Sequence, residues 1–135
     1  MRGQSEKAVH KWYPNVTKLE KVENNELYIK WLKAKLEMFD PDKSSDLKFH
    51  GTDDTGVEGI TSTGFRMPEK PGMYGKGIYF ATDASKSAQE IYTKGSSKLL
   101  LCDVLVGRAL TVSKGDSNID LKKIRENECD SVFAK

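Results

Sequence analysis

The stretch from Lys98 to Gly107, KLLLCDVLVG, constrains the fold of this chain more than any other part of it. The run is almost continuously apolar, which is typical of a strand that is covered on both faces, because a strand with one wet face alternates apolar with polar residues. We therefore expect this segment to be the central strand of the core. The residues that follow, RALTV (108–112), are expected to extend the strand beyond a bend at Gly107.

The N-terminal part of the chain predicts an edge strand followed by an amphipathic helix. The segment NVTKLEKV, residues 15–22, alternates apolar with polar residues after Pro14, as an edge strand does. A helix is expected after the possible caps Asn24 and Asn25, because apolar residues recur there at helical spacing, and Pro41 ends it. The apolar positions of this helix are Tyr28, Trp31, Leu32, Leu36 and Phe39.

The middle of the chain predicts a strand, a turn and a helix in direct succession. Leu47–His50 is expected to be a short strand that leads through Gly51 into a polar turn. In the helix that follows, Val57 and Ile60 are expected to face inward, and Gly64 lies where a C-terminal cap is expected. The candidate N-terminal caps of this helix are Asp53, Asp54 and Thr55.

The second half of the chain adds a loop, two helices and two strands. Residues 65–76 have the proline and glycine content of a loop, and GIYFA, 77–81, reads as a strand. Helices are expected over ASKSAQEIY, 84–92, and over SNIDLKKIRENE, 117–128, and DSVFAK, 130–135, begins a last strand. The expected cap of the first helix is Asp83 or Ser85. The expected cap of the second helix is Ser117, with Asp120 three residues on. The second helix is expected to bury Leu121 and Ile124.

The length and composition indicate a single α+β domain over residues 1–135, with residues 1–12 as a disordered tail. Apolar residues make up 37% of the chain, which is enough to form a core. The 22 basic and 20 acidic residues leave a formal charge of +2 and form no basic block, so the charge pattern does not indicate a nucleic-acid partner. No stretch has the length of a membrane span or the character of a signal peptide, which favours an intracellular location, cytoplasmic or nuclear.

Cysteine spacing and the common catalytic motifs narrow the kinds of chemistry further. Cys102 and Cys129 have no C-x-x-C spacing, so we expect free buried thiols, with neither a disulfide framework nor a metal site. The glycine-rich phosphate loops, the nucleophile elbow and the H-E-x-x-H motif are all absent from the sequence. The function must therefore come from another arrangement of residues.

Polar and aromatic residues gather instead where the predicted strands end, and strand ends of one sheet can converge on a cleft. His50, Gly51 and Thr52 finish one predicted strand, and Tyr79 and Ser87 lie in or after another. Each also has a purely structural interpretation: a histidine that is satisfied within the fold, a tyrosine that alternates with its neighbour across a sheet, and a serine bonded within its helix. Spacing alone leaves both interpretations open.

The order of four sequence blocks adds a more specific indication. The blocks are, in this order, FHGT, YGKGIYFATDASKSA, LLLCDVLVGRAL and DSVFA. Together they closely resemble the catalytic domain of the poly(ADP-ribose) polymerases, which are diphtheria-toxin-like ADP-ribosyltransferases. The resemblance spans Phe49 to Ala134. It implies an ADP-ribosyltransferase fold of two packed antiparallel or mixed sheets that form an NAD+-binding cleft, with short flanking helices. It also implies transfer of ADP-ribose from NAD+ to an acceptor, expected to be a protein, with loss of nicotinamide.

The resemblance assigns roles to individual residues. His50, expected to bond a ribose hydroxyl, and Tyr79, expected to stack on nicotinamide, are the first two members of the family's H-Y-E triad. The backbone of Gly51 and the hydroxyl of Ser87 are expected to hold the nicotinamide amide, and no metal is implied. Weaker expectations concern four further residues as contacts of NAD+. Arg66 and Tyr74 lie on the donor loop, residues 65–76, and Thr52 and Tyr92 lie beside the motifs.

Two departures from the family pattern leave three functions open. Glu90 occupies the position where many relatives place a second stacking tyrosine, and Tyr92 lies two residues further on. The triad glutamate lies beyond the DSVFA strand in the family, past Lys135, and Glu128 and Asp130 precede that strand, so we do not expect them to replace it. We therefore expect a truncated domain whose open sheet edge is covered by a further C-terminal segment, a second chain or self-association. The chain is then an ADP-ribosyltransferase domain, an inactive NAD+-binding module, or an interaction domain on the same scaffold.

Overall fold

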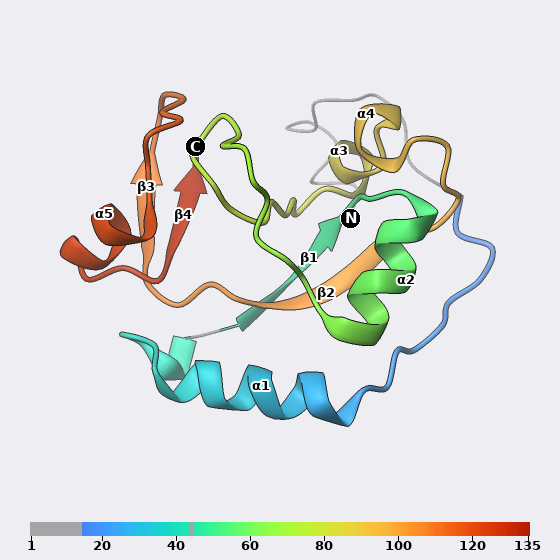
Figure 1. Cartoon of the computed structure of the whole chain (residues 1–135), viewed down its shortest axis with the longest axis horizontal. Helices are drawn as coiled ribbons and strands as arrows, with labels where there is room; N and C mark the ends of the chain where they lie inside the picture. The colour runs from blue at the N-terminus through green and yellow to red at the C-terminus, as the bar shows by residue number, and fades with distance from the viewer. Residues whose placement is uncertain (1–14, 44) are drawn as a thin grey trace. The chain divides into compact units, whose positions relative to one another are not determined.

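The computed structural model describes residues 15–43 and 45–135 and contains short helices and short strands (Figure 1). The expected tail, residues 1–12, lies outside the described residues. In chain order the elements are α1 (Asn25–Leu36), η2 (Pro41–Lys43), β1 (Ser45–His50), α2 (Asp54–Thr63), α3 (Ala84–Ser87), α4 (Glu90–Thr93), β2 (Leu100–Leu105), β3 (Ala109–Val112), α5 (Leu121–Glu126) and β4 (Ser131–Ala134).

The chain divides into two compact units, each of which is described by itself. Of the described residues, the first unit contains 15–24 together with Leu47–Gly64 and Tyr79–Asp103. The second unit contains Asn25–Asp46, Phe65–Ile78 and Val104–Lys135.

Two small sheets organise the described strands. Strand β1 pairs with β2, and β3 pairs with β4 in parallel, with Ala109 opposite Ser131 and Val112 opposite Ala134. The mixed helix and sheet content that the sequence predicts is confirmed at this level. The finer expectation, two packed sheets around an NAD+ cleft, stays a prediction.

The apolar run from Lys98 to Gly107 forms β2, but two expectations about it are wrong. Its burial alternates, with Leu101 56% exposed and Asp103 also exposed, so the strand is not covered on both faces. The residues RALTV do not extend it either, because they form β3, which belongs to the other sheet. The reason is a sharp turn at Gly107, which has φ +52° and whose α-carbon lies against the side chain of Asp130.

Of the two elements expected in the N-terminal part of the chain, the helix is confirmed and the edge strand is not. The helix is present as α1, but its predicted inward face is largely exposed: Tyr28 is 59% and Leu36 80% accessible, and Trp31 is better covered. The predicted strand over residues 15–22 is irregular, with Leu19 88% exposed. In place of ladder bonds, Asn24 anchors the end of this segment by donating to the carbonyls of Thr61 and Ser62 at 3.1 and 3.0 Å, near the end of α2.

Helix α2 follows the sequence prediction closely. Asp53 caps it, accepting a hydrogen bond from the Gly56 N–H on Oδ1 at 2.7 Å. Gly64 ends it by donating its N–H to the Ile60 carbonyl at 2.9 Å. Val57 and Ile60 are half-buried. The β1 end and the start of α2 are therefore joined by only three residues, which fixes Gly51 and Thr52 at the junction.

Segment 77–92 differs from the sequence prediction at two points. GIYFA is not a strand, because only Ala81 pairs with β1, as an antiparallel bridge to Phe49, before the chain turns into the Asp83 cap. The expected single helix is split into α3 and α4, because Gln89 has extended backbone with ψ 142°. Asp83, one of the two expected caps, is the cap of α3.

The C-terminal helix begins later than predicted, and this changes what it buries. Asp120, not Ser117, caps α5, accepting from the Lys123 N–H at 2.8 Å. Leu121 then lies in the first turn and is 65% exposed, whereas Ile124 is half-buried. The buried apolar residues that the structure describes are Ile119 and Cys129, 3% and 6% exposed. The expected strand at the end of the chain is confirmed as β4.

The cysteines are unpaired, Cys129 being buried and Cys102 half-buried on β2. Burial raises the pKa of the Cys102 thiol to about 11. Among the helices of the described residues, none combines the length and apolar character that a membrane crossing requires.

Gly56 and Gly59 of α2 provide a matched test of packing at the β1–α2 junction. A Cβ at Gly59 meets nothing within 4 Å, so Gly59→Ala should raise the free energy of unfolding by about 0.5–1 kcal/mol. A Cβ at Gly56 would overlap the Thr52 hydroxyl, so Gly56→Ala should lower it by about 1–3 kcal/mol. Urea unfolding followed by circular dichroism measures both, and equal effects at the two positions would contradict the contact between Thr52 and α2.

The raised pKa of Cys102 predicts slow alkylation. A shift from 9.0 to about 11 lowers the thiolate population near pH 8 by about a hundredfold, and the thiolate is the reactive form. We expect iodoacetamide to modify Cys102 in the folded protein far more slowly than in the chain unfolded by guanidinium, as measured by peptide mass spectrometry. Equal rates in the two states would show that Cys102 is not covered.

Candidate functional site

The candidate site of the first unit is built around the end of β1. Phe49 forms an antiparallel bridge with Ala81: its N–H donates to the Ala81 carbonyl at 2.7 Å, and its carbonyl accepts from the Ala81 N–H at 2.9 Å. This single residue pair fixes segment 79–81 against the strand that ends at His50. Two motifs whose paired residues, Phe49 and Ala81, are 32 positions apart in sequence are thereby brought together.

His50 is oriented by the backbone of Tyr79. Its Nδ1 lies 2.7 Å from the Tyr79 carbonyl oxygen, and its ring lies 5.4 Å from the Phe80 ring, centroid to centroid, tilted by 53°. Because a carbonyl oxygen only accepts, Nδ1 must carry the proton in this bond. A neutral imidazole with Nδ1–H has Nε2 as its acceptor, so Tyr79 determines which nitrogen of His50 can receive a hydrogen bond.

Gly51 is required by packing within the protein. A Cβ built at this position would overlap the Ser87 carbonyl and would lie 3.3 Å from Cβ of Tyr92. The absence of a side chain therefore lets β1 approach α3 and α4. No hydrogen bond joins the N–H or carbonyl of Gly51 to another residue in the part of the chain that the structure describes.

Ser87 reaches the same strand end from α3. Its side chain is 6% exposed, and its hydroxyl donates to the Phe49 carbonyl at 3.0 Å. The helix start that delivers it is fixed by Asp83, whose Oδ1 accepts from the N–H of Ser85 at 3.0 Å and from its hydroxyl at 2.8 Å. Ser85 is fully buried. The Ser87 hydroxyl therefore already makes a hydrogen bond within the fold.

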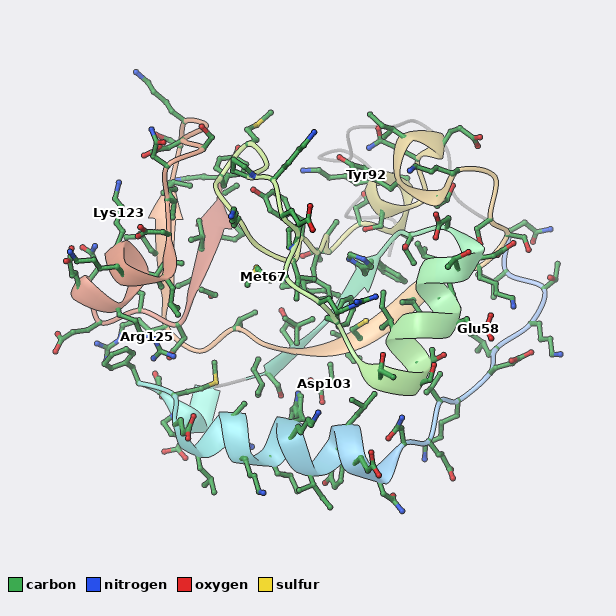
Figure 2. The ribbon with its side chains drawn as sticks, viewed as in Figure 1. Glu58, Met67, Tyr92, Asp103, Lys123 and Arg125 are labelled. Atoms are coloured by element: carbon green, nitrogen blue, oxygen red, sulfur yellow. The ribbon has the colours of Figure 1, made fainter. Side chains whose placement is uncertain are left out.

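Both tyrosines that the structure describes in the first unit are accessible. Tyr79 is 43% exposed, so its ring retains surface on which a planar group can stack. Tyr92 lies on α4 and is 48% exposed (Figure 2). Thr52 packs against Gly56. Five predicted residues, His50, Gly51, Tyr79, Ser87 and Tyr92, are therefore connected by these contacts.

Arg66 and Tyr74 belong to the second unit, which is described by itself. They lie in the predicted loop, which the structure confirms as irregular except for a turn closed by a bridge between Gly72 and Gly75. Arg66 is exposed and Tyr74 is half-buried. Their assignment as ligand contacts stays a prediction.

The acidic residue Asp130 has a structural role in the second unit. Its side chain is 2% exposed and accepts hydrogen bonds from the N–H groups of Phe39 and Arg108, each at 3.1 Å. Arg125 of α5 lies 3.5 Å from it and also covers the Phe39 ring at 5.4 Å (Figure 2). This carboxylate therefore holds the end of α1, the β2–β3 connection and α5 together.

Two residues that matter at the strand end were not expected from the sequence. Phe80 packs beside the His50 ring, and the Phe49 carbonyl accepts two hydrogen bonds. The position of Phe80 next to Tyr79 in GIYF was the available signal. A backbone carbonyl carries no signal in the sequence.

Comparison with known proteins agrees with these features. The family model of the poly(ADP-ribose) polymerase catalytic domain matches residues 2–134. The chain belongs to this family. The expected resemblance, drawn over Phe49–Ala134, is confirmed and extends over nearly the whole sequence.

Individual poly(ADP-ribose) polymerase relatives match shorter segments. Poly [ADP-ribose] polymerase 2 of Arabidopsis thaliana is 37% identical over 94 residues, which are 64% of this chain and 15% of the plant protein. Poly [ADP-ribose] polymerase 2 of Caenorhabditis elegans is 31% identical over 99 residues, 70% of this chain and 18% of the nematode protein. Protein mono-ADP-ribosyltransferase PARP3 of Gallus gallus is 36% identical over 78 residues, 54% of this chain and 14% of the chicken protein. The chain thus spans less than a fifth of these relatives.

The buried bond of Ser87 gives a stability prediction for the strand end. Ser87→Ala leaves the Phe49 carbonyl with one partner fewer, and the free energy of unfolding should fall by about 1–2 kcal/mol. Ser97→Ala, at an exposed serine of the same unit, should change it by less than about 0.5 kcal/mol. Chemical denaturation measures both variants, and no difference between them would mean that the Ser87 bond does not stabilise the junction.

Proposed function

We propose that this chain is an NAD+-dependent ADP-ribosyltransferase domain that transfers ADP-ribose to a protein acceptor and releases nicotinamide. The observation that carries the proposal is the hydrogen bond between His50 and the Tyr79 carbonyl, because it joins two triad positions of the family and sets the acceptor nitrogen of the histidine. The names of the relatives support the transferase class.

Each residue at the strand end has a group suited to part of NAD+. The Nε2 of His50 is an acceptor for a ribose hydroxyl. The exposed ring of Tyr79 offers a face to the planar nicotinamide, and the N–H and carbonyl of Gly51 can pair with its carboxamide. These groups bind and orient the dinucleotide, which lowers the entropic cost of reaching the reactive geometry.

Ser87 fits the carboxamide in two ways. While its hydroxyl donates to the Phe49 carbonyl, Oγ is an acceptor for the amide N–H of nicotinamide. Donation to the carboxamide oxygen, which the resemblance implies, requires the hydroxyl to rotate away from Phe49. In this second arrangement Ser87 exchanges a structural bond for a ligand bond, which costs part of the binding free energy.

The proposed transfer breaks the bond between the ribose C1′ and the nicotinamide nitrogen, and nicotinamide leaves with the bonding electron pair. The ribose passes through an oxocarbenium-like state, as in glycoside hydrolysis, before an acceptor nucleophile bonds to C1′ and loses its proton. In this scheme the residues of the first unit hold both the leaving group and the ribose. We further propose that Arg66 and Tyr74 contact the dinucleotide from the donor loop, with Thr52 and Tyr92 supporting the motif residues.

Substitutions at the strand end test the ligand assignment. His50→Ala and Tyr79→Ala should each weaken NAD+ binding by about tenfold or more, because each removes a direct contact, and Tyr92→Ala should have a smaller effect. Ile91→Ala, at a 72% exposed side chain of α4, should leave binding unchanged. Isothermal titration calorimetry with NAD+ measures the four variants, after circular dichroism has shown that each is folded.

Two outcomes decide the proposal. Equal effects of all four substitutions would mean that the site lies elsewhere. Incorporation of labelled ADP-ribose into protein by this chain within a longer polypeptide of the family would support transfer, whereas saturable NAD+ binding without incorporation would favour the second candidate, an NAD+-binding module.

A further inference from the structure

The segment between β3 and α5, residues 113–120, contacts the glycine-closed turn of the donor loop within the second unit. The N–H of Asp116 donates to the Met73 carbonyl at 2.7 Å. A Cβ at Gly115 would lie 2.8 Å from Cγ of Met73, and a Cβ at Gly75 would overlap the Ile119 carbonyl. The turn Gly72–Gly75 is therefore packed tightly against this segment.

Hydrogen bonds and burial hold both sides of this contact in place. In the turn, the N–H of Gly72 donates to the Gly75 carbonyl at 3.0 Å, and the reverse bond is 3.2 Å. Gly75 is buried with φ +93°, a conformation in which a side chain is strained. Ile119, on the other side, is 3% exposed. The backbone of the Gly72–Gly75 turn therefore packs directly against the backbone of segment 113–120.

Asp116 holds segment 113–120 together through its hydrogen bonds. Its carboxylate accepts from the Asn118 N–H at 2.9 Å and pairs with Lys123 of α5 at 3.4 Å, while its carbonyl accepts from the Ile119 N–H at 3.3 Å. The Asn118 N–H and the Lys123 ammonium hold the pKa of this carboxyl below its usual value, so it stays ionised at neutral pH. Figure 2 labels Lys123 on α5, the helix that follows segment 113–120.

We propose that Asp116 is a positioning residue for NAD+ binding: it fixes segment 113–120, which holds the Gly72–Gly75 turn and thereby places Tyr74 of the donor loop. The inference rests on the proposed function, because the ligand is NAD+. In the proposed complex Asp116 itself touches no reacting atom. A preformed turn removes the ordering cost that a loose donor loop would impose on binding.

The test compares Asp116→Ala with Lys122→Ala. Lys122 lies next to Lys123 on α5, but its ion pair is with Glu126 at 4.0 Å, so it is a matched control. In Asp116→Ala, amide hydrogen exchange of the peptide that contains Gly72 and Gly75 should accelerate by about five- to tenfold, as expected for loss of a bond that supports the turn. Exchange in α2 should not change, and Lys122→Ala should match the wild type in both regions.

The same variants are then titrated with NAD+. The proposal predicts that Asp116→Ala raises the dissociation constant by about five- to tenfold, and that Asp116→Asn, which keeps an acceptor for the Asn118 N–H, has a smaller effect. Unchanged exchange at the turn would overturn the positioning role whatever the affinity, and faster exchange with unchanged affinity would overturn its link to NAD+. If the wild type does not bind NAD+, the proposed function fails, and the exchange experiment still decides whether Asp116 fixes the turn.

Discussion

The carbonyl oxygen of Phe49 is the acceptor on which the candidate site depends. It receives the Ala81 N–H at 2.9 Å and the Ser87 hydroxyl at 3.0 Å, so both of its lone pairs are used. The first bond holds the segment whose Tyr79 carbonyl orients His50, and the second holds α3 against Gly51. One backbone group therefore aligns three separate parts of the sequence. Without it, neither the tautomer of the histidine nor the approach of the serine would be determined.

The second unit uses a carboxylate for the same purpose. Asp130 accepts hydrogen bonds from Phe39 and Arg108 in a nearly inaccessible position, where leaving those donors unpaired would be costly. The acidic residue nearest the end of the sequence is thus part of the scaffold. Acidic residues close to a family motif are not evidence of catalysis until their hydrogen bonds are known, and here those bonds are already satisfied within the fold.

Local signals in the sequence predicted the elements that local physics determines. The Asp53 cap, the Gly64 end of α2 and the strand at Leu47–His50 were predictable because caps and turns act over a few residues. The failures at β2 and at GIYFA depend on distant contacts. The apolar run of β2 is not covered on both faces, and GIYFA forms one bridge where a strand was expected, because pairing partners are not encoded in periodicity. The site residues came from the family resemblance, whereas the double acceptor at Phe49 could be seen only in the structure.

The hydrogen bond to the Tyr79 carbonyl holds the proton of His50 on Nδ1 and leaves Nε2 as the acceptor nitrogen, which binds NAD+ in the proposed complex. Long-range ¹H–¹⁵N correlation spectra of histidine-labelled protein, recorded at roughly pH 9 where imidazoles are neutral, distinguish the two tautomers directly. The sequence contains two histidines, and His10→Gln assigns the signals. We expect an Nδ1–H tautomer for His50 and a shift of its Nε2 resonance on addition of NAD+. An Nε2–H tautomer, or an Nε2 resonance that saturating NAD+ does not move, would contradict it.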